Sequence, residues 1–575
     1  MALALAPGVG LGLAAAGGRL AVAAEDARLA AVVEAVEREV RPRWVVWSPE
    51  TAATMVAEGV RVATCWDVAA VARLLFGGWR ADPALVWARL HDLPDDTVPA
   101  VAPLDLFSQA AAAGERNDGD AVDDPVRGDG HLRPEWVDGG WAADPDRLAA
   151  WAAVALVAAE RQRARLARLD TGAPAPPGAA APVAPASARS ESTAELLCAE
   201  LAADGLPVDR AAAERIIAGF VGPRPRSEAE AAAQRVRRDA EVLRHAPEAG
   251  DVDLRSPAQV RSLLRRVGVE VPDTRAWRLE RLRDAHPVVG ALLAWRKAER
   301  IATTYGYAWL DRHVGADGRL RGAWTASDGA AGRMTASAGL HNMPADLRAA
   351  VAAEPGHVFV RADLGQVEPR VLAAVSGDAA LARAAADDDL YAPVAARMGV
   401  DRATAKVAVL GAMYGQTTGH GAQVLPRLVA AFPVAMAYLD AADRAGQAGR
   451  DLRTHGGRLV RLGPVTSGGM SEREARRRAA ARGRYARNAM VQGAAAELFK
   501  MWAVTVRARS APLGARIVLC LHDELLVHVP AAQAGATAGS VVECLSEAVQ
   551  RWAPGTPVRF VADVATVARW SDAKA

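Results

Sequence analysis

The sequence has few cysteines and no strong net charge. Cys65, Cys198, Cys520 and Cys544 lie far apart and form no CxxC pair. This argues against structural zinc and a disulfide scaffold, and it suits a reducing cytoplasm. The formal net charge of the 575-residue chain is only +2. Bulk electrostatics therefore does not identify a nucleic-acid binder, and the distribution of charge along the chain has to carry that inference.

Long apolar runs are also absent. The first 18 residues are apolar, but they lack a basic start and are interrupted by glycine and proline. We interpret them as the opening strands of a domain and not as a signal peptide. No later stretch is long and apolar enough to span a membrane. Alanine and arginine are abundant while lysine, isoleucine and aromatic residues are scarce, which is typical of a GC-rich genome and carries no functional information. The length predicts two to four domains.

The composition changes along the chain. Residues 1–165 combine β-like runs at Arg43–Trp47 and Val60–Ala63 with a helical stretch at Asp146–Leu169. Between residues 170 and 190 nearly every residue is Ala, Pro, Gly or Ser. This composition predicts a linker, and a Pro-rich surface loop inside one domain is the alternative.

From Ser192 onward the sequence is strongly helical. Thr193–Ala203 and Asp209–Phe220 have amphipathic spacing, and Asp209 suits the N-cap position. His286–Leu310 predicts one long helix rich in Arg and Lys.

The first candidate motif is His357–Arg370, HVFVRADLGQVEPR. Its apolar start predicts a buried strand that ends at Asp363, after which Leu364-Gly365 turns the chain into a helix near Gln366. A carboxylate at a strand end is rigidly placed and open to a cleft, which suits a metal ligand. The alternative is an Asp that caps the following helix.

The second motif is Arg516–Pro530, RIVLCLHDELLVHVP. Two strongly apolar runs flank His522-Asp523-Glu524, which predicts a buried β-hairpin with acidic residues at its tip. Charged tips are common in ordinary turns. The apolar strand on both sides is unusual and would hold the carboxylates in place.

Two helices carry functional stripes. In Asp401–Gly415 the residues Arg402, Lys406, Leu410 and Tyr414 recur every fourth position, between a good N-cap and a good helix stop. The stripe changes from cationic to apolar to aromatic, which is the order that the phosphates and base of a nucleoside triphosphate require. A helix with a solvated basic end and a buried apolar end is the alternative.

The second stripe lies in Arg484–Lys500, where Arg484, Asn488 and Gln492 share one helical face. Side-chain donors on one face suit the minor groove, where every base pair offers acceptors. A polar stripe on a surface helix is the alternative.

From about Ser192 to the C-terminus, the order of these motifs resembles the family A DNA polymerases, the bacterial polymerase I type. Asp363–Arg370 resembles the first palm motif and Arg402–Gly415 the fingers motif. Asn488–Gly493 resembles the segment between the fingers and the second palm motif, which His522–Glu524 resembles.

Two further stretches agree with this resemblance. Gly332–Thr335 followed by Leu340–Pro344 resembles the family segment T-G-R-L-S-S…N-L-Q-N-I-P. Trp295–Tyr305, after His286-Pro287, resembles the thumb helix that grips duplex DNA.

The resemblance implies an α+β multidomain fold. A right-hand polymerase of palm, fingers and thumb would follow an N-terminal α/β ribonuclease H-like domain of the 3′–5′ exonuclease type. The implied bounds are 1–169 for the degenerate exonuclease-like domain, 170–191 for a Pro/Ala-rich linker and 192–575 for the polymerase domain, with the thumb about 192–305, the palm about 306–370 and 484–575, and the fingers about 371–483.

The implied reaction is template-directed DNA synthesis in DNA repair or replication gap filling. A primer 3′-hydroxyl attacks the α-phosphate of a dNTP, and pyrophosphate leaves. Two Mg²⁺ ions, with Mn²⁺ as a substitute, would be held at Asp363, Leu364 and Asp523, and Glu524 would be a helper.

The resemblance also implies nucleotide and DNA contacts. Arg402 and Lys406 would hold the triphosphate and offset charge on the leaving group, while Glu368 would exclude ribonucleotides by a clash at C2′. The implied nucleotide-binding set is Gln366, Glu368, Arg402, Lys406, Leu410 and Tyr414. The implied DNA-binding set is Arg296, Arg300, Arg333, Asn342, Arg484, Asn488, Gln492 and His522.

The implied partners are primer–template DNA and dNTPs, with no membrane. We expect a monomer in the bacterial cytoplasm, associated with the nucleoid.

Five positions depart from the family pattern. Leu410 stands where an aromatic residue is usual, which puts discrimination against dideoxynucleotides in doubt. Tyr391 replaces a common His, His341 replaces the usual Gln, and Leu364-Gly365 replaces Tyr-Ser beside the metal site.

The N-terminal region departs further. Its candidate first strand, Trp44–Glu50, lacks the Asp of the exonuclease D-x-E motif. Asp67 could match a later exonuclease acid, but no Tyr-x3-Asp pattern surrounds Asp144 and Asp146. We therefore predict that proofreading is lost, and we expect no 5′ nuclease domain. The alternatives are a bifunctional exonuclease–polymerase and a catalytically silent DNA-binding protein with the polymerase fold.

Overall fold

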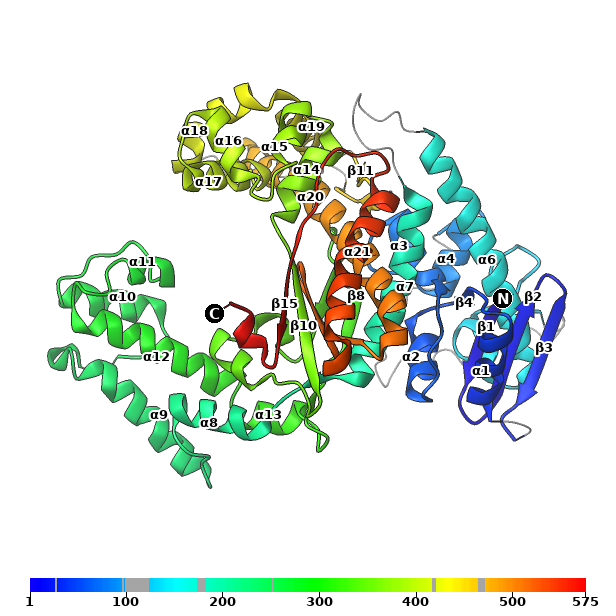
Figure 1. Ribbon diagram of the computed structural model, residues 1–575, viewed down its shortest axis with the longest axis horizontal. Coiled ribbons are helices and arrows are strands. Elements are labelled where there is room, and N and C mark those ends of the chain that lie inside the picture. Colours follow the sequence, from blue (N-terminus) through cyan, green and yellow to red (C-terminus); the bar gives the residue numbers. More distant parts are fainter. Residues whose placement is uncertain are drawn as a thin grey trace. The chain divides into compact units, whose positions relative to one another are not determined.

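The computed structural model describes residues 1–25, 28–95, 98, 124–172, 183–250, 252–415, 420–463 and 471–574. The chain divides into two units (Figure 1). Unit 1 contains Met1–Ala203, Trp324–Thr335 and Val360–Thr566, and unit 2 contains Asp204–Ala323, Ala336–Phe359 and Val567–Ala575.

The apolar opening of the chain forms a sheet in unit 1, as predicted. The strand order is β3 (Gly18–Ala23), β2 (Gly10–Ala15), β1 (Ala2–Ala6), β4 (Trp44–Val46) and β5 (Cys65–Asp67). β1 pairs antiparallel with β2 and parallel with β4. The strand predicted within Arg43–Trp47 is confirmed. The strand predicted at Val60–Ala63 is wrong. The Val60 amide donates to the Met55 carbonyl and closes helix α2, and the residues that follow form a loop that buries Val60 and Val62.

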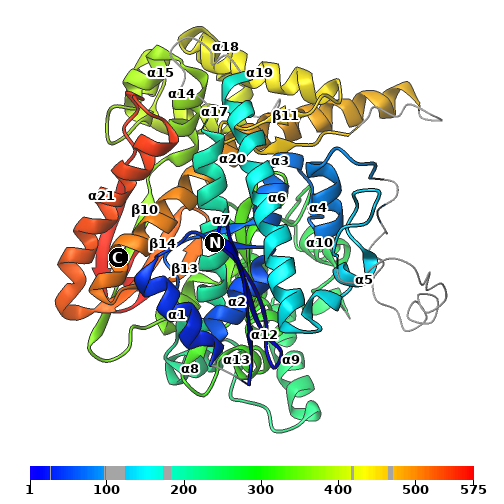
Figure 2. The same ribbon diagram turned by 90° about the vertical axis from the view of Figure 1, so that its right-hand side faces the viewer.

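Helices cover this sheet. They are α1 (Leu29–Glu39), α2 (Pro49–Ala57), α3 (Val68–Phe76), α4 (Pro83–Leu90), α5 (Pro134–Val137) and α6 (Pro145–Gly172). α6 confirms the helix predicted at Asp146–Leu169 and packs on β1, β2 and β3 (Figure 2). Gly12 permits this contact, because a Cβ there would lie 2.1 Å from the Ala149 amide nitrogen.

The predicted linker is wrong in its second part. Residues 173–182 lie outside the described part of the chain, but α7 begins at Ala184 and runs to Asp204. Its alanines favour a helix, and two of its buried serines bond their hydroxyls within the helix. Ser190 donates to the Ser187 carbonyl at 2.9 Å, and Ser192 donates to the Ala188 carbonyl at 2.9 Å. A composition typical of linkers therefore forms a buried helix.

A four-stranded sheet forms the centre of the C-terminal part. Its order is β13 (Arg516–Leu521), β14 (Glu524–Pro530), β10 (His357–Leu364) and β15 (Ala562–Val567). β13 and β14 form the predicted hairpin. The 39-residue helix α20 (Glu472–Ser510) and α21 (Ala534–Trp552) pack against each other and against this hairpin (Figure 2).

A group of helices lies between the two palm motifs in the sequence. They are α14 (Val367–Ser376), α15 (Ala379–Ala384), α16 (Tyr391–Met398), α17 (Arg402–Met413), α18 (His420–Ala431) and α19 (Pro433–Gln447). Short strands β8 (Trp324–Asp328) and β9 (Arg333–Ala336), and β11 (Leu452–Arg453) and β12 (Leu459–Val460), form two-stranded pairs. Asp401 caps α17 as predicted, since its carboxylate accepts from the Thr404 amide at 2.9 Å.

No single helix in the described ranges has the length and hydropathy to cross a membrane. Gln423–Ala431 and Pro433–Gln447 meet that standard only when taken together, and they are bent by 116° at their junction.

Unit 2 is mostly helical. Its helices are α8 (Arg210–Val221), α9 (Glu228–Leu243), α10 (Pro257–Arg266), α11 (Ala276–Glu280), α12 (Pro287–Thr304) and α13 (Tyr307–His313), and β6 (Leu206–Pro207) pairs with β7 (Arg319–Leu320). Asp209 caps α8 as predicted. The single helix predicted at His286–Leu310 is wrong, because the chain breaks at Tyr305–Gly306. Tyr305 is buried there, and its hydroxyl donates to the Gly339 carbonyl at 2.9 Å.

Short 3-10 helices complete the chain. They are η1 (Gly140–Ala142), η2 (Pro247–Ala249), η3 (Leu340–Asn342), η4 (Ala345–Ala350), η5 (Ala511–Leu513), η6 (Ala531–Gln533) and η7 (Trp570–Lys574).

Candidate active site

Neighbouring strands bring Asp363 and Asp523 to the same edge of the four-stranded sheet. Asp363 is the second-last residue of β10, and Asp523 lies in the two-residue turn between β13 and β14. The Leu364 amide donates to the Asp523 carbonyl at 2.9 Å, so the end of β10 is joined directly to the hairpin tip. His522 has a φ of +53°, a left-handed conformation that costs about 1–2 kcal/mol in a residue with a Cβ. The tight turn fixes the position from which the Asp523 carboxylate projects.

A buried arginine holds the acidic residues of this edge. Arg361 lies on β10 with its side chain 2% exposed and forms an ion pair with Asp363. It also contacts Glu524 at 3.0 Å and Asp563 at 3.2 Å. Glu524, predicted to assist the metal site, is therefore buried, and its carboxylate is paired with Arg361. Sequence reasoning missed Arg361, although residues two apart on a strand project from the same face.

A cavity of about 460 Å³ lies in unit 1 beside this edge. Nine predicted site residues line it, namely Arg333, Gln366, Glu368, Lys406, Leu410, Tyr414, Gln492, His522 and Asp523. The same lining includes Tyr391, the predicted departure from the usual His. The cavity is thus lined by Lys406, predicted to contact phosphates, by Glu368, predicted to contact the sugar, and by Asp523, predicted to hold a metal ion.

Glu368 is held by two side chains that also line the cavity. Its carboxylate accepts from the Tyr414 hydroxyl at 2.7 Å and from Arg333 at 3.2 Å. Burial and the bond to Glu368 raise the pKa of the Tyr414 phenol to about 12, so Tyr414 remains a donor at neutral pH. These contacts fix the Glu368 carboxylate against the cavity wall.

Arg402 belongs to the predicted stripe but does not line the cavity. Its guanidinium, 56% exposed, contacts Asp389 at 2.6 Å. Asp389 also accepts from the Gln366 side chain at 2.9 Å and from the Tyr391 amide at 3.1 Å. The hydrogen bond from Arg402 lowers the pKa of Asp389. Sequence reasoning missed Asp389, because an acidic run before a helix also suits a solvated surface.

The predicted stripe on α20 is only partly at the cavity. Gln492 lines it, whereas Arg484 is exposed and packs near Gly415. The Asn488 side-chain oxygen is buried and has no hydrogen-bond partner among the described residues. A ligand that supplies a donor could satisfy that oxygen.

The remaining predicted DNA contacts lie in unit 2. Arg296 donates to the Thr274 carbonyl, and Arg300 donates to the Asn342 carbonyl at 2.5 Å. Arg300 is exposed on α12, the helix on which the family resemblance predicts that Arg296 and Arg300 contact phosphates, and the neighbouring Lys297 is exposed as well.

The candidate exonuclease acids do not form a comparable site. Asp67 is fully buried, and its carboxylate caps α3 by accepting from the Ala70 amide at 2.8 Å. Burial, followed by the nearby Glu195, raises the pKa of Asp67 well above its usual range. Glu50 is exposed in the first turn of α2. Because Asp67 is enclosed and its carboxylate caps α3, it is not placed to present a ligand to a metal ion.

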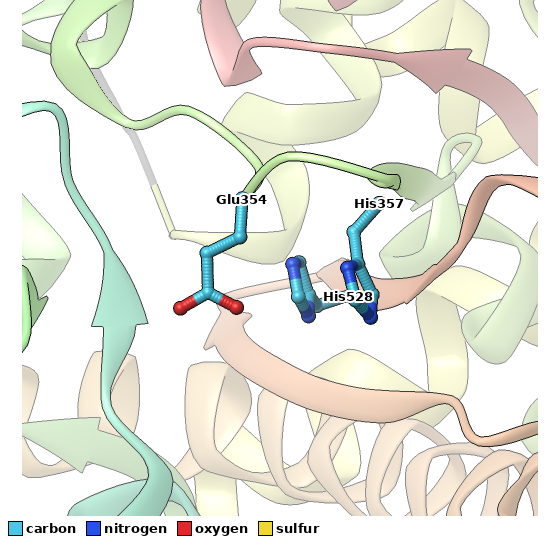
Figure 3. A group of neighbouring side chains, drawn as sticks. All are labelled: Glu354, His357 and His528. Atoms are coloured by element: carbon cyan, nitrogen blue, oxygen red, sulfur yellow. The ribbon is translucent and has the colours of Figure 1, made fainter.

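Figure 3 shows three other acid and imidazole side chains. Glu354 and His357 belong to unit 2, while His528 lies on β14 in unit 1. None of the three lines the cavity described above, and we assign them no role.

Comparisons with known proteins agree with the geometry. The family described as DNA polymerase family A matches residues 226–572. DNA polymerase I, thermostable, of Thermus filiformis is 32% identical over 299 residues, which cover 47% of this chain and 35% of that protein. DNA polymerase I of Chloroflexus aurantiacus is 33% identical over 282 residues, covering 44% and 29%. The chain thus spans about a third of the length of these curated relatives.

A solved structure has the same fold. It is the POL domain of Pol1 from M. smegmatis, in complex with DNA primer-template and dNTP. The likeness covers 99% of this chain and 93% of that chain, with a TM-score of 0.67 and 22% identity. The α+β polymerase fold is therefore shown.

Proposed function

The chain belongs to DNA polymerase family A, and on that premise we propose that it is a template-directed DNA polymerase. It would add dNTPs to a primer 3′-hydroxyl and release pyrophosphate, in repair or gap filling within the bacterial cytoplasm. The observation that carries this proposal is the cavity of unit 1, where Asp523, Lys406, Glu368 and Tyr414 surround one space beside Asp363.

The acidic edge fits divalent cations. Asp363 and Asp523 offer carboxylate oxygens from adjacent strands, and Leu364 can offer only its main-chain carbonyl, so the donor set is the hard oxygen type that Mg²⁺ prefers. Two bound Mg²⁺ ions would lower the pKa of the attacking hydroxyl and neutralise the triphosphate, and Mn²⁺ could substitute. Asp363, side chain 27% exposed, remains accessible while Arg361 holds it.

The cations of α17 would bind the triphosphate. Lys406 is exposed at the cavity and would contact phosphate oxygens directly. Arg402 would have to leave Asp389 or share it, since Asp389 occupies its Nε and one Nη donor. Charge on the departing pyrophosphate would be stabilised by these cations.

The opposite wall would select the sugar and the base pair. Glu368, fixed by Tyr414 and Arg333, would lie at C2′ and exclude a ribose hydroxyl. Leu410 presents an apolar surface to the nucleotide without a flat aromatic face. Gln492 would contact the new pair from the minor-groove side.

The N-terminal domain would serve as a scaffold and not as a nuclease. Wild-type protein with labelled primer–template and Mg²⁺ but no dNTPs should leave the primer intact, because Asp67 is enclosed. Shortening of the primer that is abolished by Glu50→Ala or Asp67→Ala would establish the bifunctional alternative instead.

A primer-extension assay with single dNTPs tests the proposed function. The protein should add only the nucleotide complementary to the next template base, and only with Mg²⁺ or Mn²⁺. Binding of primer–template without any extension would support the silent DNA-binding alternative, and addition regardless of the template would contradict templated synthesis.

A further inference from the structure

Arg361 directs its guanidinium toward three carboxylates. Nε donates to Glu524 Oε1 at 3.0 Å, Nη1 donates to Asp563 Oδ2 at 3.2 Å, and Nη2 donates to Asp363 Oδ2. The three acids come from three strands, β14, β15 and β10. One side chain therefore links three strands of the four-stranded sheet at its acidic edge.

The partners differ in how strongly they depend on Arg361. The Glu524 side chain is only 5% exposed, so its charge is enclosed and needs a buried cation. Asp563 is 78% exposed, where solvent screens the pair. Asp363 is intermediate at 27%. The buried Arg361–Glu524 pair is therefore the constant part of the cluster, and Asp363 is the partner that also belongs to the proposed metal centre.

This arrangement has two consequences for Asp363. Its Oδ2 is engaged by a planar, permanently charged guanidinium, which restricts the carboxylate to one orientation. The same positive charge lies among Asp363, Glu524 and Asp563 and reduces the attraction of the edge for other cations. Orientation and charge thus act on metal binding in opposite directions.

We propose that Arg361 is a positioning residue that orients Asp363, keeps Glu524 out of the metal-binding set and limits the affinity of the centre for divalent cations. The proposal rests on the proposed polymerase function, since it concerns the same metal centre. Arg361 does not line the cavity, so it would touch neither nucleotide nor primer.

The test measures Mn²⁺ binding and extension separately. Binding of Mn²⁺ alone to the full chain, followed by the electron paramagnetic resonance signal of free Mn²⁺, should be about tenfold tighter for Arg361→Met than for the wild type, because a cation is lost and Glu524 is released. Single-turnover primer extension with saturating Mg²⁺ should be about 10–100-fold slower, because Asp363 loses its orientation. A simple folding defect would not tighten metal binding.

Arg361→Lys separates charge from orientation. It keeps the positive charge but lacks the fork that reaches three carboxylates. We expect Mn²⁺ affinity within about twofold of the wild type and extension at least about tenfold slower. Should Arg361→Met fail to fold, this variant decides alone: a wild-type extension rate would overturn the proposal.

Arg370→Met is the matched control. Arg370 is fully buried on α14 and donates to main-chain carbonyls, including those of Gly365 and Ala385, and to the Gln366 side chain. Its loss should lower the melting temperature and leave Mn²⁺ affinity unchanged. Equal Mn²⁺ affinity in Arg361→Met, Arg370→Met and the wild type would overturn the proposal, as would weaker binding in Arg361→Met alone.

The two levels of inference fail separately. Should the wild type show no extension, the proposed function fails, yet the Mn²⁺ measurements still report the effect of the Arg361 charge. Asp523→Asn, which should weaken Mn²⁺ binding in the wild-type background, establishes that the signal comes from this centre.

Discussion

At the scale of single residues, Glu368 makes the contact with the clearest functional consequence. Its carboxylate is fixed by the Tyr414 hydroxyl and by Arg333, so it cannot swing away from an incoming sugar without breaking two hydrogen bonds. A small side chain would leave space there and would release Tyr414 from its acceptor.

Glu368→Ala should admit ribonucleotides. The selectivity for a dNTP over the matching rNTP should fall by about 10–200-fold, the range expected when a steric contact worth about 1–3 kcal/mol is lost. Competition between dNTP and rNTP in single-nucleotide extension measures it. Tyr414→Phe keeps the ring and serves as a control with a smaller loss; unchanged sugar selectivity in Glu368→Ala would remove Glu368 from this role.

The sequence located most cavity-lining residues but not the residues that hold them. Glu368, Lys406 and Tyr414 belong to motifs with recognisable spacing, so their convergence was predictable. Arg361 and Asp389 were not, because each is identified only by partners distant in sequence. Arg402 shows the limit of periodicity: it shares a helical face with Lys406, but Asp389 captures its guanidinium away from the cavity.

At the scale of elements, α20 lines part of the cavity and also takes part in a buried ionic network. Glu497 is enclosed, and its carboxylate accepts from the Gly456 amide at 2.7 Å and from the Thr454 hydroxyl. Lys500, one turn later, contacts Glu191 of α7 at 2.5 Å, and Arg458 contacts the same carboxylate at 2.7 Å. The helix is thereby tied to α7 and to the β11–β12 segment.

Glu497 should give stability a measurable pH dependence. Burial raises its pKa from an ordinary value of 4.5 to about 7, so the folded state binds the proton more tightly than the unfolded state. Its contribution is present below pH 4.5 and is lost as the pH rises to 7. Relative to Glu497→Gln, the wild type should lose up to about 3 kcal/mol of unfolding free energy between pH 5 and pH 8.

Urea denaturation of both proteins at pH 5 and pH 8 makes that comparison. Gln keeps the shape of the protonated acid: its amide oxygen accepts from the Gly456 amide, and its NH2 group donates to the Thr454 oxygen once that hydroxyl turns its own proton away. The difference between the two proteins removes contributions from other titrating groups. A constant difference across this range would mean that Glu497 is ionised in the folded protein.

The start of a helix was predictable from the sequence where the helix has a capping residue. Asp209 and Asp401 identified the starts of α8 and α17 because an Asp carboxylate satisfies free amides of the first turn. The break at Tyr305–Gly306 depends on burial of the Tyr305 ring and was not predictable from spacing. α7 was also missed, because its Ala- and Ser-rich sequence resembles a linker until its neighbours bury it.

At the scale of the whole chain, the N-terminal domain is bonded to the C-terminal part of unit 1. Arg507 of α20 contacts Glu200 through two nitrogens, both at 2.7 Å, and donates to the carbonyls of Val62 and Ala63 at 2.7 and 2.9 Å. Four strong acceptors surround one guanidinium. The N-terminal domain is thus an integral part of this unit.

Arg507→Ala should destabilise the protein by about 3–5 kcal/mol, because it leaves the Glu200 carboxylate, 8% exposed, without its cation. Arg509→Ala, two residues later on the same helix, removes an exposed ion pair with Glu547 and should have little effect. Chemical denaturation of both variants provides the comparison. Equal, small losses would show that the Arg507 contacts do not hold the two parts together.

The overall architecture was predictable because the order of motifs identifies the family and the family fixes the fold. The division into units was less so. Residues 192–203, predicted as the start of the thumb, lie in α7 of unit 1, and unit 2 begins at Asp204. Burial of α7, which sets that division, depends on contacts with Arg73, Arg458, Lys500 and Arg507 far along the chain.

The most direct test of the account is the pair of variants Asp363→Asn and Asp523→Asn. Each keeps the side-chain shape and removes one carboxylate charge from the proposed metal centre, so Mg²⁺-dependent primer extension should fall by at least about 10³-fold, as expected when a group central to transition-state stabilisation is lost. Primer–template affinity, measured by fluorescence anisotropy, should change less than about threefold, because other cations bind the phosphates. Extension by either variant near the wild-type rate would contradict the assignment of the catalytic centre.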